Sequence, residues 1–222
     1  RMSTFTTPPV SELLPRLFAD AAATQAQLRQ MFGSLTPEER ASRMADASRD
    51  YRAFYSKAKA IHLAVSPETG RLLYMLARAT RAKAIVEFGT SFGLSTICLA
   101  AALRDNGGGA LIGSEFESEK LAHARANLQA AGLADLVEIR DGDALESLAH
   151  DLPATIDLVL LDGHKPLYPR ILDYVAPKLR AGACLVADNA DASPEYLERV
   201  RAPNGGFVSV PFADDVELSV KL

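Results

Sequence analysis

The stretch Ala84-Ile85-Val86-Glu87-Phe88-Gly89-Thr90-Ser91-Phe92-Gly93 decides how this chain folds. Its first five residues form a short run that is apolar apart from Glu87, which is typical of a buried strand. Gly89 follows at once, and a glycine there allows a tight turn and the close approach of a ligand. A helical pattern then runs from Leu94 to Leu103. A strand, a glycine turn and a helix in this order predict the start of a parallel α/β sheet.

Short apolar runs alternate with helical patterns along the rest of the chain. We expect further strands at 110–114, 137–140, 156–161 and 183–187, and helices at 117–131, 144–150, 168–179 and 194–201. Strands that are continuous apolar runs, separated by helices, predict a parallel sheet covered on both faces. Two last strands, at 207–212 and 216–221, predict an antiparallel hairpin at one edge. The predicted fold class is therefore α/β, a Rossmann-like doubly wound sheet of seven strands.

The first 83 residues have a different, helical pattern. Apolar positions spaced by three and four predict a helix over 10–31, and Thr36-Pro37-Glu38-Glu39 is a typical helix start before a second stretch at 37–59. Ser66-Pro67-Glu68-Thr69 repeats that start signal before a third helix. No linker separates these helices from the rest. We predict one domain over 1–222, with a helical cap or dimerisation segment at 1–83 and a cofactor-binding and catalytic core at 84–222.

The composition limits the function classes. The chain has 222 residues, of which 48% are hydrophobic and 23% charged, and its net charge is −4. That charge argues against a strongly basic nucleic-acid binder, although residues 1–83 carry 13 basic and 7 acidic residues. Cys98 and Cys184 lie far apart in apolar runs, which predicts buried free thiols and suits a reducing compartment. No apolar run approaches the length of a transmembrane helix and no signal-peptide pattern is present, so we expect a cytoplasmic protein.

Acidic residues mark the ends of the predicted strands. Ligands of open α/β sheets bind outside the carboxyl ends of the strands, and six acids are expected there: Glu87, Glu115, Asp141, Asp143, Asp162 and Asp188. Glu115 follows the strand next along the chain from the glycine turn, where an acid can accept hydrogen bonds from both ribose hydroxyls of a nucleoside. Its alternative role is that of an acid favoured at a helix start. The Gly-x-x-x-Gly spacing of Gly89 and Gly93 disfavours a nicotinamide-dependent oxidoreductase.

These motifs resemble those of the class I S-adenosylmethionine (SAM)-dependent methyltransferases. Val86 to Gly93 looks like the first motif of that class, Glu115 matches its ribose-binding acid, and Gly142-Asp143-Ala144 matches the stretch that contacts adenine. The resemblance implies SAM as cofactor. The cofactor-binding residues it implies are Val65, Glu87, Gly89, Thr90, Ser91, Gly93, Ser95, Glu115, Phe116, Gly142, Asp143, Ala144, Asp162 and His164.

A narrower resemblance points to the metal-dependent catechol O-methyltransferase family. Its motifs are Leu161-Asp162-Gly163-His164-Lys165-Pro166-Leu167-Tyr168, Ala187-Asp188-Asn189 and Val65-Ser66-Pro67-Glu68-Thr69-Gly70. The resemblance implies that Asp162, Asp188 and Asn189 bind Mg²⁺ and that Lys165 deprotonates the substrate hydroxyl. The chemistry is consistent, because Mg²⁺ prefers oxygen ligands and makes a bound hydroxyl easier to ionise. Taken singly, Asp188 and Asn189 could cap the next segment, Lys165 could be a solvated loop residue and Tyr168 could belong to the core.

The chain departs from the animal catechol enzymes in its substrate walls. It contains no Trp, and His164 takes the place of one aromatic wall. Residues 202–213 contain no Glu, so the late glutamate that those enzymes offer to a substrate hydroxyl has no counterpart there. Asp191 is a further acid close to the predicted metal ligands.

The sequence thus predicts a Mg²⁺-dependent O-methyltransferase for a small catechol-like or phenolic acceptor, and by resemblance a homodimer. One alternative is an RNA methyltransferase acting on a hydroxylated nucleobase. A basic helix would then hold the RNA phosphates through Arg40, Arg43, Arg49, Arg52, Lys57 and Lys59, whereas interleaved acids favour an ordinary charged surface. The other alternative is a non-catalytic nucleoside-binding module, which the presence of Asp162, Lys165 and Asp188 disfavours.

Overall fold

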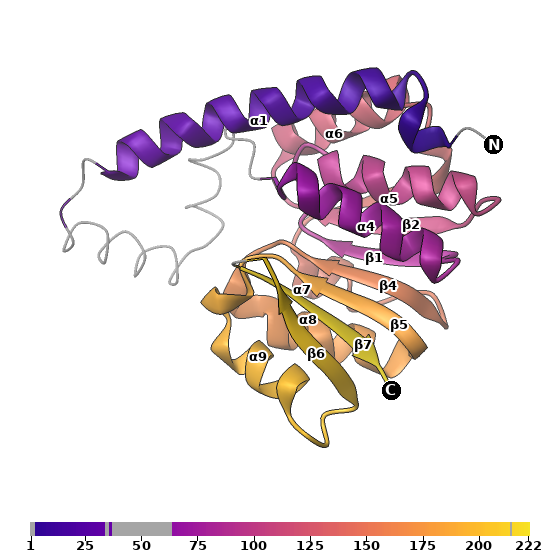
Figure 1. The fold of residues 1–222 in the computed structure, drawn as a ribbon, viewed down its shortest axis with the longest axis vertical. Helices are drawn as coiled ribbons and strands as arrows, with labels where there is room; N and C mark the ends of the chain where they lie inside the picture. Colours follow the sequence, from indigo (N-terminus) through magenta and orange to yellow (C-terminus); the bar gives the residue numbers. More distant parts are fainter. Residues whose placement is uncertain (1–2, 34–35, 37–63, 214) are drawn as a thin grey trace.

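The computed structural model describes residues 3–33, 36, 64–213 and 215–222 (Figure 1). The second predicted helix, at 37–59, and its basic residues lie outside these ranges. The described helices are α1 (Val10–Gly33), α4 (Pro67–Ala79), α5 (Leu94–Asp105), α6 (Ser118–Ala130), α7 (Ala144–Ser147), α8 (Tyr168–Val175) and α9 (Pro194–Arg201). Short 3-10 turns are η1 (Thr4–Thr6), η2 (Ala134–Leu136), η3 (Lys165–Leu167), η4 (Ala176–Lys178) and η5 (Ala190–Ala192).

The centre of the fold is a seven-stranded sheet with the order β3-β2-β1-β4-β5-β7-β6. Its strands are β1 (Ala84–Phe88), β2 (Ala110–Glu115), β3 (Val137–Asp141), β4 (Ile156–Leu161), β5 (Leu179–Ala187), β6 (Phe207–Phe212) and β7 (Val216–Lys221). The first five pair in parallel, and β7 pairs antiparallel with both β5 and β6. The predicted fold class, with its antiparallel hairpin at the edge, is confirmed.

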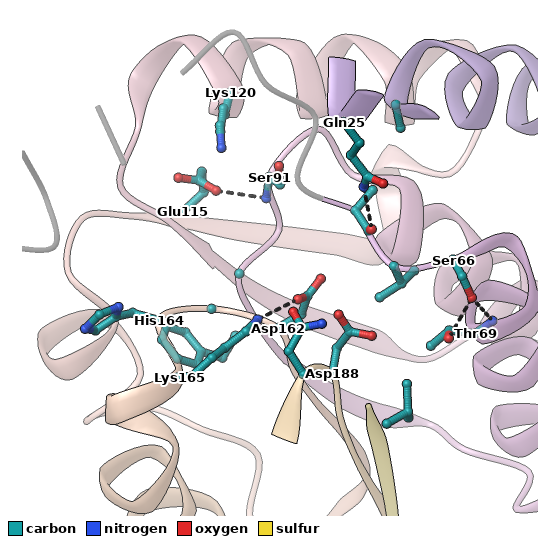
Figure 2. Close-up of a pocket in the computed structure, with 18 of the residues that line it drawn as sticks. Gln25, Ser66, Thr69, Ser91, Glu115, Lys120, Asp162, His164, Lys165 and Asp188 are labelled. Carbon is teal, nitrogen blue, oxygen red and sulfur yellow. Dashed lines mark hydrogen bonds and ion pairs between the residues drawn. The ribbon is translucent and has the colours of Figure 1, made fainter. Parts of the chain in front are cut away.

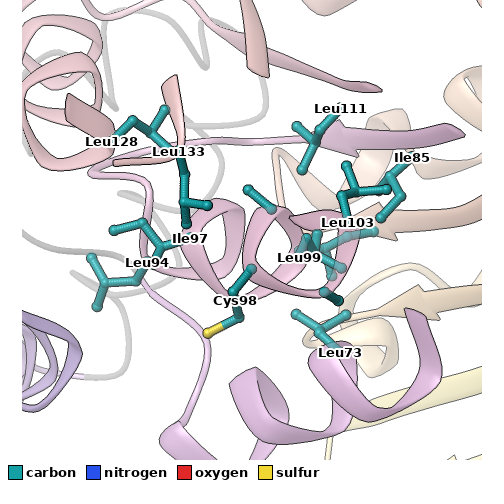
Figure 3. Close-up of a cluster of buried hydrophobic side chains, with 14 of the residues drawn as sticks. Leu73, Ile85, Leu94, Ile97, Cys98, Leu99, Leu103, Leu111, Leu128 and Leu133 are labelled. Atoms are coloured by element: carbon teal, nitrogen blue, oxygen red, sulfur yellow. The ribbon is translucent and has the colours of Figure 1, made fainter. Parts of the chain in front are cut away.

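Two hydrophobic cores cover the two faces of the sheet. Ile85 of β1 packs into one core with α1, α4, α5 and α6, and its neighbour Val86 packs into the other with α7, α8 and α9. Both residues are fully buried, because side chains alternate between the faces of a strand and both faces are covered. Figure 3 shows α5 at the centre of the first core, where Leu99 and Leu103 meet Leu73 of α4.

The segment before β5 differs from its predicted boundaries. The predicted helix at 168–179 ends as α8 at Val175, followed by the turn η4, and β5 begins at Leu179 rather than at the predicted residue 183. Pro177 lacks the backbone N–H that an α-helix needs at this point. The pairing of β5 with β4 shifts in register, and Gly182 adopts a positive φ of 79° within that irregularity. The predicted helix at 144–150 is likewise shorter, as α7.

The N-terminal segment is tied to the helices beneath it. The Asp105 carboxylate at the end of α5 accepts hydrogen bonds from the Thr4 amide, at 2.9 and 3.0 Å, from the Thr4 hydroxyl at 2.6 Å and from the Tyr74 hydroxyl at 2.7 Å. The ring of Phe5 stacks on that of Tyr74, with centroids 4.5 Å apart. These contacts hold the start of α1, which lies across the outer side of the helical layer that contains α5 and α6 (Figure 1).

Candidate functional site

A cavity of about 590 Å³ opens at the carboxyl ends of the parallel strands. It collects most of the predicted site residues, which come from six separate segments of the chain (Figure 2). The predicted residues that line it are Val65, Gly89, Ser91, Glu115, Phe116, Gly142, Ala144, Asp162, His164, Lys165, Asp188 and Asn189. The predicted site residues that do not line the cavity are Glu87, Thr90, Gly93, Ser95 and Asp143. The sheet topology therefore brings together predicted site residues that lie far apart in the sequence.

The glycine turn after β1 allows two strand ends to meet. Gly89 has a positive φ of 97°, and a Cβ atom built on it would lie 2.6 Å from the backbone oxygen of Asp162 after β4. No side chain fits there, so the backbone of the turn packs directly against the neighbouring loop. Gly93 also has a positive φ, of 84°, at the start of α5. The turn thus places Ser91 and Asp162 on the same cavity.

Glu87 lies behind this turn and supports it. Its carboxylate is fully buried and accepts hydrogen bonds from the hydroxyls of Ser95 and Thr96, both at 2.6 Å, and of Thr90 at 3.0 Å. Burial raises the pKa of Glu87 to about 7, although the three hydroxyl hydrogen bonds lower it. In this structure Glu87, Thr90 and Ser95 therefore hold the turn in shape. Asp143, also predicted as a binding residue, caps α7 by accepting a 2.9 Å hydrogen bond from the Leu145 amide.

Glu115 presents a fixed carboxylate at the end of β2. It accepts hydrogen bonds from three backbone amides: Ser91 at 2.8 Å, Phe116 at 2.9 Å and Glu117 at 2.8 Å. Burial raises its pKa, while the Glu117 amide and the nearby cation of Lys120 oppose that rise. The side chain is 8% exposed and lines the cavity. Such a carboxylate is fixed in place and able to accept further hydrogen bonds from a ligand.

Asp162, Lys165 and Asp188 converge at the ends of β4 and β5. Lys165 Nζ donates a 3.1 Å hydrogen bond to Asp162 Oδ1. Asp162 and Asp188 lie close enough to influence each other's ionisation. Burial raises the pKa of both carboxyls, that of Asp188 to about 8, and the charge of Asp162 adds to the rise at Asp188. The site thus gathers two buried carboxyls and one amine at neighbouring strand ends.

Tyr168 connects the ends of β4 and β5. Its hydroxyl lies 2.8 Å from the backbone oxygens of both Leu161 and Asp188, and the residue is fully buried. The core role weighed for Tyr168 in the sequence is therefore correct. His164 is half-buried and lines the cavity, and burial lowers its pKa, which favours the neutral ring. That position suits the predicted role of an aromatic wall.

Sequence reasoning missed an acid on the C-terminal hairpin. Asp215 precedes β7, lines the cavity and accepts a 2.8 Å hydrogen bond from Nδ2 of Asn189. The backbone also connects the two segments, since the Ala190 amide donates to the Asp215 carbonyl at 2.8 Å. Asp215 lies two residues beyond the stretch 202–213, in which a late Glu was expected and is absent. Asp191, which the sequence had singled out, is exposed and outside the cavity lining.

Sequence reasoning also missed the part of the cavity lining that α1 contributes. Phe18, Ala21, Ala22 and Gln25 of α1 line it, and Gln25 Nε2 donates a 3.2 Å hydrogen bond to the backbone oxygen of Ala64. No local motif marks these residues. Their only sequence signal is the helical spacing of apolar positions, which shows a buried face without showing what it covers.

No three His, Cys, Asp or Glu side chains within the described ranges cluster closely enough to hold a metal ion. The predicted donor set contains only two such residues, with the amide of Asn189 as its third member. None of the described helices combines the length and apolar character needed to cross a membrane.

Comparisons with known proteins agree with this geometry. Residues 86–190 match the model of a family described as a methyltransferase domain. The catechol O-methyltransferase of Niastella koreensis is 38% identical over 139 residues, which cover 61% of this chain and 62% of that relative. The match thus spans less than two thirds of the relative's length.

Solved structures show the same fold. The cofactor-bound protein Rv0187 from MTB is 27% identical, with a TM-score of 0.67 over 89% of this chain and 95% of that one. The O-methyltransferase TomG from Streptomyces achromogenes, in complex with SAM, is also 27% identical, with a TM-score of 0.62 over 81% of this chain and 89% of that one.

Proposed function

We propose, from the premise that residues 86–190 form a methyltransferase domain, that this chain transfers the methyl group of SAM to a hydroxyl of a small catechol-like or phenolic acceptor. The observation that carries the proposal is the meeting of Lys165, Asp162 and Asp188 on one cavity with Glu115 and the glycine turn. A nucleoside-binding site at this edge of the sheet would by itself be consistent with many kinds of enzyme. The amine and the two carboxyls beside it are the groups that hydroxyl activation requires.

The cavity suits SAM at its Glu115 end. The hydroxyls of Ser91 and Ser114 are buried, line the cavity and have no hydrogen-bond partner among the described residues. Buried hydroxyls without partners are uncommon, because each forfeits hydrogen bonds it would make in water. A polar ligand bound between them would supply those bonds. The SAM-bound TomG structure supports the same assignment.

The donor set also fits a divalent cation. Asp162, Asp188 and Asn189 offer oxygen atoms only, which Mg²⁺ prefers. The hydrogen bond from Nδ2 of Asn189 to Asp215 leaves the amide oxygen of Asn189 as the atom available to a cation. Burial raises the pKa of both carboxyls, and at Asp188 the charges of Asp162 and Asp215 add to the rise, so a cation bound there would favour the ionised forms. When bound, such an ion makes an acceptor hydroxyl easier to ionise.

The chain's own residues then perform three tasks. Lys165 would take the proton of the acceptor hydroxyl at Nζ. The acceptor oxygen would then form a bond to the methyl carbon of SAM while the carbon–sulfur bond breaks, which would leave a methyl ether and S-adenosylhomocysteine (SAH). Asp215 lies beside Asn189, where its carboxylate would accept a hydrogen bond from a second acceptor hydroxyl, and His164 would form one wall. The cavity volume of about 590 Å³ is typical of small-molecule sites.

The test is methyl transfer from SAM to a panel of catechols, with Mg²⁺ and with a chelator. We expect turnover that the chelator abolishes. Asp188→Asn should lose the Mg²⁺-stimulated turnover, whereas the matched variant Asp191→Asn, which makes the same charge change at an exposed neighbour, should retain it. Turnover unaffected by the chelator would refute the metal assignment, and no turnover on any catechol would refute the acceptor class. The homodimer and the cytoplasmic location stay predictions.

A further inference from the structure

Lys120 is a buried cation that the proposed reaction does not use. It lies in the first turn of α6, is 4% exposed and lines the cavity beside Glu115. Figure 2 shows its amine directed toward the Glu115 carboxylate and the Ser91 turn. The ring of Phe92 lies below it, with the centroid 6.0 Å from Nζ.

The amine of Lys120 lies near carboxylate charges but makes no hydrogen bond to the described residues. Within the ranges that the structure describes, Lys120 donates no hydrogen bond and forms no ion pair with a carboxylate. Burial lowers its pKa, and the charges of Glu115, Glu117 and Asp162 raise it again. A buried ammonium that makes no hydrogen bond is costly, and a lysine carries three N–H donors. A ligand in the cavity would therefore find these donors available.

The position of Glu115 indicates which ligand group would receive them. Its carboxylate is held by three backbone amides, so it stays in place when a ligand binds. By the proposed function, this carboxylate accepts hydrogen bonds from the ribose of SAM. Each ribose hydroxyl has one proton and two lone pairs, so a hydroxyl that donates to Glu115 still needs a donor of its own. Lys120 lines the cavity beside Glu115, is buried there, and makes no hydrogen bond to any of the described residues.

We propose that Lys120 donates a hydrogen bond to a ribose hydroxyl of SAM, so that Glu115 and Lys120 together recognise the ribose diol as acceptor and donor. The inference rests on the proposed function, because it needs SAM in this cavity. It goes beyond that function by assigning Lys120 to the discrimination of ribonucleosides from deoxyribonucleosides. A lysine that merely balanced the charge of Glu115 would contribute equally to ligands with and without the hydroxyl.

The experiment measures binding by calorimetry for three ligands: SAH, its 2′-deoxy analogue and its 3′-deoxy analogue. The proteins are the full chain, Lys120→Met, and Lys178→Met as a matched control, since Lys178 lies in η4 outside the cavity lining. We expect Lys120→Met to weaken SAH binding about tenfold or more, as for a lost charged hydrogen bond. It should weaken one deoxy analogue by less than about threefold, because the hydroxyl that Lys120 would contact is already missing.

The outcomes separate this inference from the proposed function. If Lys120→Met binds SAH as the unmodified chain does, or weakens all three ligands by the same factor, the assignment to the ribose is wrong. If the unmodified chain does not bind SAH, the proposed function fails first and this inference fails with it. Circular dichroism checks that Lys120→Met is folded. If it is not, Lys120→Gln, which retains a shorter neutral donor, provides the same comparison across the three ligands.

Discussion

Nζ of Lys165 lies 3.1 Å from Oδ1 of Asp162, and both side chains are largely buried, with 16% and 11% of their surfaces exposed. Asp162 follows β4 directly, and Lys165 begins the turn η3 three residues later. Nζ also lies 5.5 Å from the centroid of the Tyr168 ring. The rigid end of a central strand therefore fixes the amine above the cavity, where positioning contributes to catalysis.

Replacing this amine should stop the chemistry while leaving SAM binding intact. We expect Lys165→Met to lower kcat by about a hundredfold or more, the usual contribution of a general base. The Kd for SAH should stay within about threefold, because Glu115 and the glycine turn are untouched. Steady-state kinetics and calorimetry measure the two quantities, with Lys178→Met as control. A kcat within threefold of the unmodified chain would remove Lys165 from the mechanism.

Asp215 should act through the amide of Asn189. In Asp215→Ala the 2.8 Å hydrogen bond from Nδ2 is lost, so the orientation of the Asn189 amide is no longer held by that contact. Removing a partner that orients a metal ligand typically weakens metal binding about tenfold to a hundredfold. We expect the Mg²⁺ concentration for half-maximal turnover to rise by that factor, with an unchanged Kd for SAH. Asp191→Ala is the control, and an identical Mg²⁺ dependence in both variants would contradict this role.

Glu87 should make the stability of the fold depend on pH. Its pKa is about 7 in the folded protein against an ordinary value of 4.5, so the folded state binds the extra proton between these values. The free energy of unfolding should therefore fall as pH rises through this window, by up to about 3 kcal/mol. Glu87→Gln cannot ionise there.

Urea unfolding at pH 5 and pH 8 tests this expectation. The stability of Glu87→Gln relative to the unmodified chain should increase between the two values, and other titrating groups cancel in that difference. A relative stability that is the same at both values would show that Glu87 is already ionised in the folded protein at pH 5.

Two glycines allow the cost of a positive φ to be measured separately from the cost of a steric clash. Gly89 and Gly142 both have positive φ angles, of 97° and 110°. A Cβ atom on Gly142 would meet nothing within 4 Å, whereas one on Gly89 would lie 2.6 Å from the Asp162 backbone oxygen. We expect Gly142→Ala to cost about 1–2 kcal/mol of stability, the ordinary strain of this backbone region. Gly89→Ala should cost more and also weaken SAH binding. Thermal unfolding of both variants measures the difference, and equal losses would show that the turn can move.

The C-terminal hairpin shows how far local patterns reach. The sequence predicted strands at 207–212 and 216–221, and both are present with these bounds. The same pattern could not show that the turn between them brings Asp215 to Asn189, because β7 inserts between β5 and β6. The shortened helix before β5 is a smaller case, since a register shift in the sheet decided where that strand begins.

The sequence by itself determined the parallel sheet, the glycine turn and the set of acids that follow its strands, because each is written in local periodicity and spacing. It also placed Lys165 and Asp162 three residues apart in one loop. Only the tertiary structure decided that Glu87 supports the turn from behind, that α1 covers the cavity, and that Lys120 and Asp215 face it. These relationships depend on how distant segments pack, and burial and charge at a cavity arise only when several chain segments meet there.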